Sequence, residues 1–124
     1  MPWTLRKINH QGEKAEKSAL QYLKKQGLKF LSKNFACTYG ELDLIMLDSD
    51  TLTFIEVRFR SKSRFGSPAE SITQSKMKKI RMAANIFLQH NSQHKRRFCR
   101  FDAVTITHDD DSNQNRLQWT KGAF

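Results

Sequence analysis

Two acidic residues stand inside otherwise apolar segments of the chain. Asp43 interrupts the apolar run of residues 42–47, and Glu56 interrupts the run of residues 52–57. Both runs carry aliphatic, aromatic or β-branched side chains on both alternating faces, which is typical of strands covered on both sides. Because a buried carboxylate is costly unless it is paired, the two positions predict a site that attracts a cation.

The residues between the two runs predict a tight turn. If a two-residue loop is centred on Ser49-Asp50, each residue pairs with the one whose number brings the sum to 99. The pairs predicted in this way are Asp43 with Glu56, Ile45 with Phe54, Leu47 with Leu52 and Glu41 with Arg58. Like charges opposed on a sheet cost roughly 0.2–1 kcal/mol. A longer loop makes the two carboxylates diagonal neighbours, still on one face.

A pair of carboxylates on adjacent strands suits one hard divalent cation, Mg²⁺ or Mn²⁺. The backbone carbonyl of Val57 and water would complete its coordination. Such an ion polarises a phosphate and lowers the pKa of a bound water, so that hydroxide attacks phosphorus at neutral pH. Arg58 lies two residues after Glu56 and projects from the same face, where its charge can stabilise the developing negative charge. We therefore predict phosphodiester hydrolysis at this pair.

The residues alone also allow an interpretation without a metal. Glu41 and Arg58 can form an ordinary cross-strand ion pair, and Arg60 or Lys76 can neutralise Glu56. The protein would then be a binding module without catalysis.

The charge of the chain favours a polyanionic partner. It has 124 residues, one domain's worth, with a formal net charge of +10 and a pI near 10.0. Nucleic acid is the commonest such partner, and solubility alone is the competing explanation. The cations predicted to contact nucleic acid are Arg60, Lys62, Arg64 and Lys79.

Location and redox state follow from what the sequence lacks. No apolar run approaches the roughly 18–20 residues of a membrane-spanning helix, and residues 1–11 hold no signal-peptide core, so a cytoplasmic protein without membrane contact is expected. Cys37 and Cys99 lie far apart and are expected to be reduced and buried.

The surrounding pattern predicts the elements that position the two acids. The order is α-β-β-β-α-β, an α/β class with a mixed central sheet flanked by helices, in a single domain over residues 1–124. The segments are an arm at 1–8, a helix from Asn9 to Gly27, a strand at 28–39 interrupted at 32–34, the hairpin, a loop at 61–71, a helix from Ser71 or Thr73 to His90, a strand at 101–107, an acidic surface loop at 109–115 and a possible edge strand at 117–119.

Two further residues are placed near the acids by helical spacing. Glu16 precedes Ala19 and Leu23 of the first helix by three and seven residues, so it leans along the buried edge. Lys76 lies four residues before Ile80 and can reach around the core face of the second helix.

Other metal sites are excluded by their spacing. Asp109, Asp111 and Asn113 fit the first ligands of an EF-hand, but the required Gly and Glu are replaced by Gln114 and Thr120. The four histidines show no ligand spacing and are expected at the surface.

The two acids also carry a resemblance. Asp43 followed by Glu56-Val57-Arg58 resembles the PD-(D/E)XK nuclease signature, and the predicted element order matches the restriction-endonuclease-like core. The wider pattern, from Gly12 through YGELDLI, FIEVRFR and RFDAVTI to Phe124, resembles the YraN-like family of small bacterial proteins.

That family is similar to archaeal Holliday-junction resolvases. The resemblance implies a Mg²⁺-dependent, structure-selective endonuclease for branched or flapped DNA, a homodimer, and a first-helix glutamate at the metal, a position that Glu16 matches. Arg58 stands where the signature has Lys, and arginine cannot act as a general base. Members of the superfamily with a displaced lysine suggest that Lys76 supplies the ammonium group instead.

Overall fold

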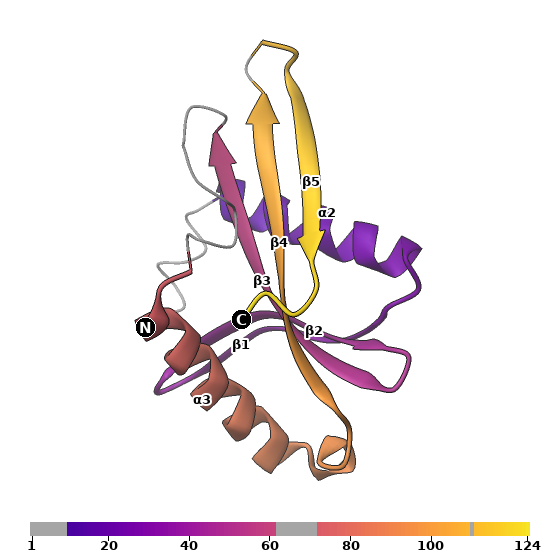
Figure 1. The fold of residues 1–124 in the computed structure, drawn as a ribbon, viewed down its shortest axis with the longest axis vertical. Coiled ribbons are helices and arrows are strands. Elements are labelled where there is room, and N and C mark those ends of the chain that lie inside the picture. Colours follow the sequence, from indigo (N-terminus) through magenta and orange to yellow (C-terminus); the bar gives the residue numbers. More distant parts are fainter. Residues whose placement is uncertain (1–9, 62–71, 110) are drawn as a thin grey trace.

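The computed structural model describes residues 10–61, 72–109 and 111–124 (Figure 1). The predictions for the arm at 1–8, and for Lys62 and Arg64, lie outside these residues. The helices and strands, in chain order, are α2 (His10–Lys25), β1 (Lys29–Cys37), β2 (Gly40–Asp48), β3 (Thr51–Ser61), α3 (Gln74–His90), the short 3₁₀ helix η2 (Ser92–His94), β4 (Cys99–Asp109) and β5 (Gln114–Thr120).

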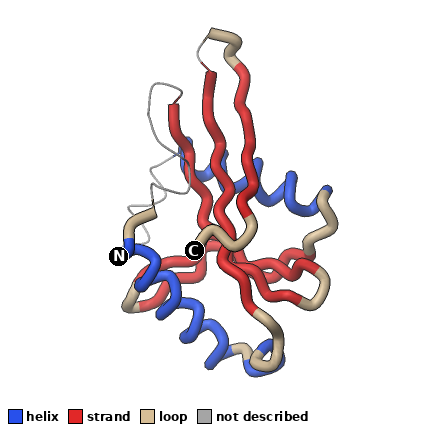
Figure 2. The backbone as a smooth tube through the Cα atoms, in the orientation of Figure 1, coloured by secondary structure: helices blue, strands red, loops and turns tan. Residues whose placement is uncertain are grey.

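The five strands form one mixed sheet in the order β1-β2-β3-β4-β5 (Figure 2). β3 and β4 are parallel and joined through α3, whereas the other neighbours are antiparallel. This is the α/β restriction-endonuclease-like arrangement that the sequence predicted, with the terminal strand present as well.

The two helices cover opposite faces of the sheet. Leu44 and Met46 of β2 belong to the core that packs against α2, while Ile45 and Leu47 belong to the core under α3. This alternation explains why β2 reads as apolar at successive positions, since each of its faces meets a helix. The α3 core includes Ile80, Ala84 and Phe87, which lie on one face of the helix.

Both helices have the ends that their sequences favour. Gly27 has φ of +98°, and the N–H of Leu28 donates to the Leu23 carbonyl at 3.0 Å, which closes α2 in a Schellman motif. Thr73 caps α3 through its side chain, which accepts a hydrogen bond from the N–H of Lys76 at 3.1 Å. The cap fixes the first turn of α3, where Lys76 lies.

The hairpin register is confirmed at its turn end and wrong at its open end. Pairing between β2 and β3 runs from Asp48 with Thr51 to Leu44 with Ile55, as predicted, and stops there. The predicted pairs of Asp43 with Glu56 and of Glu41 with Arg58 are therefore not part of the ladder. β2 separates from β3 at this point, and a side chain enters the space between them.

Three smaller expectations also need correction. β1 runs through residues 32–34 and instead shifts register between Phe30 and Ser32. The acidic loop is shorter than 109–115, because β4 extends to Asp109 and β5 begins at Gln114. Cys99 is exposed rather than buried.

His94 was expected at the surface and is buried instead. Its ring stacks on Phe87, with centroids 6.4 Å apart, and its Nδ1 accepts a hydrogen bond from Nε of Arg97. The short η2 turn carries this histidine inward, which no pattern in the sequence indicated.

Within the described ranges, no helix has both the length and the apolar composition that crossing a membrane requires.

Candidate active site

The separation of β2 from β3 brings the Asp43 carboxylate against the backbone of β3. Its Oδ2 accepts a hydrogen bond from the N–H of Val57 at 2.8 Å. Asp43 is 9% exposed and Glu56 is 5% exposed, so two carboxylates from neighbouring strands are both buried here. The two acids do share a site, although they reach it without being directly paired in the sheet.

Lys76 of α3 reaches this pair of acids and forms an ion pair with Glu56. Its Nζ lies 2.7 Å from Oε1 of Glu56, and its side chain remains 41% exposed. Lys76 is three residues after the cap residue Thr73, so the first turn of α3 determines where its stem starts. The prediction that Lys76 reaches around the core face of α3 agrees with this contact.

The electrostatic balance at Glu56 is unfavourable to its charge. The pKa of Glu56 rises from 4.5 to about 7, chiefly because of burial and then because of repulsion from Asp43. Lys76 and Arg58 lower this pKa but do not offset the two larger effects. Near neutral pH Glu56 is therefore only partly ionised, and a bound divalent cation would favour its charged form.

The oxygen donors fit a hard divalent ion. Two carboxylates on Asp43 and Glu56, with the Val57 carbonyl on the same strand as Glu56, are the donor types that Mg²⁺ and Mn²⁺ prefer. In the described part of the chain, no three His, Cys, Asp or Glu side chains gather to hold a metal ion. Glu16 therefore does not form a three-carboxylate group with the pair in this structure, and its role as a ligand stays a prediction.

The other predicted residues that the structure describes lie on β3 and α3. Arg58 and Arg60 are half-buried on β3, and Arg58 is close enough to lower the pKa of Glu56. Lys79 is exposed on α3 and lies beside the start of β2, because a Cβ added at Gly40 would be 3.6 Å from its Cβ. The basic residues that can be placed are thus grouped on β3 and on the first turns of α3.

A third buried carboxylate was not predicted from the sequence. Asp102 of β4 is 0% exposed and accepts four hydrogen bonds. Two come from Arg100, at 2.8 and 2.9 Å, and one each comes from Nε1 of Trp119 and the N–H of Gly122, both at 3.0 Å. Arg100 also bonds Asp48 at 2.8 Å. The signal was available, since Asp102 interrupts an apolar strand just as Asp43 does.

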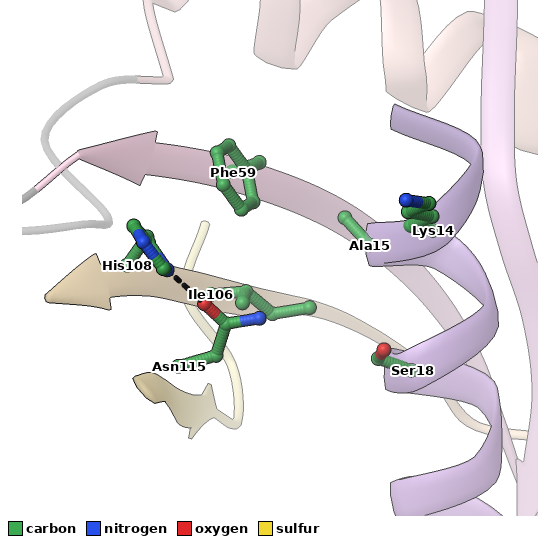
Figure 3. A pocket seen from close by; sticks show the side chains of 7 residues that line it. All are labelled: Lys14, Ala15, Ser18, Phe59, Ile106, His108 and Asn115. Carbon is green, nitrogen blue, oxygen red and sulfur yellow. Dashed lines mark hydrogen bonds between the residues drawn. The ribbon is translucent and has the colours of Figure 1, made fainter. Parts of the chain in front are cut away.

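A pocket of about 220 Å³ lies between α2 and the ends of β3, β4 and β5 (Figure 3). Its lining includes Phe59 and a His108–Asn115 pair whose Nδ1 and Oδ1 atoms are 2.7 Å apart. Phe59 lies three residues after Glu56, so the pocket and the carboxylates are on opposite faces of the sheet. None of the predicted catalytic residues lines it.

The element order, the mixed sheet and the paired acids where two strands separate define a restriction-endonuclease-like class of protein. The model of the family described as "Uncharacterised protein family UPF0102" matches residues 15–106. The chain belongs to this family, which agrees with the YraN-like resemblance of the sequence.

Relatives in several bacteria extend the match over the whole chain. A UPF0102 protein of Psychromonas ingrahamii is 45% identical over 124 residues, covering 100% of this chain and 97% of the relative. One from Pseudomonas fluorescens is 45% identical over 91% of each chain. One from Francisella tularensis is 46% identical over 91% of this chain and 92% of its own.

Proposed function

We propose that the protein is a metal-dependent endonuclease that hydrolyses phosphodiester bonds in branched or flapped DNA. The observation that carries this proposal is the pair of buried carboxylates, Asp43 and Glu56, where β2 and β3 separate. A folded protein that keeps two repelling carboxylates so close together benefits from a cation between them.

Asp43, Glu56 and the Val57 carbonyl would hold Mg²⁺ or Mn²⁺ in this proposal. The bound ion would supply a polarised phosphate oxygen and a water of lowered pKa. Glu56 ligates in its ionised form, and its raised pKa means that binding must release a proton from part of the population near pH 7. Glu16 is retained as a further ligand in the proposal, on the resemblance alone.

Lys76 and Arg58 would stabilise negative charge on the phosphate. The Lys76 ammonium group reaches the carboxylates while its side chain is 41% exposed, so a bound phosphate could contact it. An arginine side chain cannot act as a general base, so Arg58 would act through its charge alone. Neither residue would act as a base, because the proton lost by a metal-activated water would pass to bulk water.

Substrate binding would rest on the net charge of +10. Arg60 follows Glu56 by four residues on β3, Lys79 follows Lys76 by three residues on α3, and Lys62 and Arg64 follow Arg60 in the sequence. They would hold the DNA backbone, which predicts affinity that falls steeply with salt. Branched DNA as substrate and a homodimer enter the proposal through the family resemblance, and a cytoplasmic site of action enters it through the sequence.

One observation favours a second candidate, a nucleic-acid-binding module without catalysis. Lys76 contacts Glu56 at 2.7 Å and neutralises it without any metal. In a module of this kind the ion pair is permanent and structural. DNA or RNA binding would then be indifferent to Mg²⁺ and to Asp43→Ala.

A cleavage assay tests the proposal. Purified protein is incubated with forked, flapped, four-way and linear DNA in Mg²⁺, Mn²⁺ or EDTA. We expect cuts in branched DNA that require metal and disappear in Asp43→Ala and Glu56→Gln. Glu13→Ala, which changes an exposed glutamate of α2, should cut normally. Intact branched DNA in both metals, beside a control nuclease that cuts it, refutes the enzyme.

Calorimetric titration separates the two candidates. The nuclease predicts heat on adding Mn²⁺ to the wild type and none with Asp43→Ala. Absence of heat in both proteins, with retained binding of DNA, favours the module.

A further inference from the structure

Phe98, next to β4, is the most exposed large apolar side chain in the described residues, at 86%. It lies in the basic segment Lys95-Arg96-Arg97-Phe98, between η2 and β4. Leaving a phenylalanine in water forfeits the gain from burying it. Its position therefore needs an explanation other than packing within the chain.

The segment that carries Phe98 is held in place on both sides. The N–H of Leu52 donates to the Phe98 carbonyl at 2.8 Å, which ties it to the end of β3. Nε of Arg97 donates to Nδ1 of the buried His94 at 3.0 Å. The ring is thus presented to solvent by an anchored backbone.

The charge around Phe98 is mainly positive. Lys95 and Arg96 are exposed and form no ion pair with any described residue. Two carboxylates of the β2–β3 turn lie near this end of the sheet: Asp50, 3.5 Å from Arg97, and Asp48, which Arg100 and Lys121 already contact at 2.8 and 3.8 Å. Lys95 and Arg96 remain available to an anion.

We propose that Lys95, Arg96 and Phe98 form a stacking site for an unpaired nucleotide of the substrate. The inference rests on the proposed function, since it requires nucleic acid as the partner. An exposed aromatic ring beside cations is the combination that binds single strands, because any base can stack on the ring while the cations contact phosphates. A second copy of the chain fits less well, because a two-fold contact would bring these cations together.

The position of the ring limits where the unpaired nucleotide lies. Cys99, which follows Phe98, pairs with Leu52, so Phe98 lies at the level of Thr51, five residues before Glu56 on β3. At about 3.3 Å per residue this separates Phe98 from Glu56 by about 17 Å along the strand. That is about five nucleotides of duplex. The site would therefore hold a branch point a few nucleotides from the bond that is cut.

Binding without metal tests the inference apart from catalysis. A DNA duplex with a single-stranded flap containing 2-aminopurine is titrated with protein in EDTA, and the matching blunt duplex is titrated in parallel. We expect Phe98→Ala to weaken flap binding by about tenfold and to abolish the fluorescence change of 2-aminopurine, with duplex affinity unchanged. Phe98→Tyr should restore both. Phe30→Ala, which truncates another exposed aromatic at the far edge of the sheet, should alter neither.

Each other outcome overturns the inference. Equal effects of Phe98→Ala on flap and duplex, no effect on either, or no DNA binding at all would do so. A change from dimer to monomer in Phe98→Ala by sedimentation would assign the ring to a protein contact instead. Failure of the proposed function looks different: the flap binds through Phe98 in EDTA, yet nothing is cut when Mg²⁺ is added.

Discussion

Two buried carboxylates lie on the parallel strands β3 and β4 at nearly the same level, and their surroundings differ. Asp102, opposite Ile55, receives four hydrogen bonds, two of them from Arg100. Glu56, one residue further along, has an ion pair with Lys76 and the charge of Asp43 beside it. Burial alone therefore does not distinguish a functional acid from a structural one. Asp102 and Glu56 are both buried and differ in the hydrogen-bond donors around them.

The consequences for charge are opposite. The carboxylates of Asp102 and Asp48 raise the pKa of Arg100 further above its usual range, so that Arg100 stays charged at any practical pH. Burial and Asp43 raise the pKa of Glu56 to about 7, so that its charge is readily lost. A permanently satisfied pair stabilises structure, whereas an acid near its pKa at neutral pH responds to a cation.

The largest effect should come from removing the satisfied carboxylate. Asp102→Ala leaves the half-buried Arg100 with Asp48 as its one remaining carboxylate and removes the acceptor of Trp119 and Gly122. Breaking a buried ion pair costs about 3–5 kcal/mol, and the remaining contact with Asp48 places the expected loss at the lower end of that range. Urea unfolding followed by circular dichroism measures the loss. Asp111→Ala in an exposed turn is the control, with an expected change within about 0.5 kcal/mol. A loss of stability in Asp102→Ala as small as that of the control would contradict the structural role of Asp102.

The second effect is a dependence of stability on pH at Glu56. Its folded pKa of about 7 lies above the ordinary 4.5, so protonation stabilises the folded state. This contribution is complete below pH 4.5 and is lost as pH rises to about 7. At about 1.36 kcal/mol per pH unit, the loss is roughly 3 kcal/mol at most.

Glu56→Gln isolates this effect, because the amide does not titrate. We expect the unfolding free energy of the wild type, minus that of Glu56→Gln, to fall between pH 4.5 and 7.5 in urea titrations. A difference that rises over the same interval would mean that Lys76 outweighs burial and Asp43. Glu56 would then resemble Asp102.

The sequence predicted this site where the prediction depends on residues that are close together in the chain. Alternation placed Asp43 and Glu56 in buried strands, and helical spacing directed Lys76 toward them, since both patterns depend only on neighbours in the chain. The turn fixed the register up to Leu44 and Ile55. Beyond that pair, the direction of β2 depends on packing between distant elements, so the direct opposition of Asp43 and Glu56 was wrong.

The Asp102 cluster shows why the rest could not be predicted. Its donors come from Arg100, Trp119 and Gly122, and the last two lie on a strand and turn that meet Asp102 only after the sheet has formed. Alternation identifies a buried acid without counting its donors. The same limit applies to the segment before β4, where His94 is buried and Phe98 is exposed although both stand in a polar, basic stretch of the sequence.

Binding of Mg²⁺ at Asp43 and Glu56 should stabilise the folded protein by less than the two effects above. A Mg²⁺ concentration ten times its dissociation constant would stabilise the wild type by about 1.4 kcal/mol. We expect a rise in the thermal midpoint with Mg²⁺ that is absent in Asp43→Ala. Asp111→Ala should respond as the wild type does, because its exposed turn is remote from the pair. An equal rise in all three proteins would indicate non-specific binding of the ion.

The smallest expected effect concerns how the two cations are held. Arg100 lies within a sheet, whereas Lys76 begins on the first turn of α3, which the Thr73 side chain caps. Thr73→Ala removes that cap at a cost of about 1 kcal/mol. It should also loosen Lys76 and so raise the pKa of Glu56 further, because Lys76 lowers it. Urea titrations against pH should place the Glu56 transition higher in Thr73→Ala. Thr73→Ser keeps the hydroxyl acceptor and should match the wild type. Thr73→Ala could instead lower stability and leave the pH of the Glu56 transition unchanged. That result would mean that the contact with Glu56 positions Lys76 without help from the cap, as the contact with Asp102 positions Arg100.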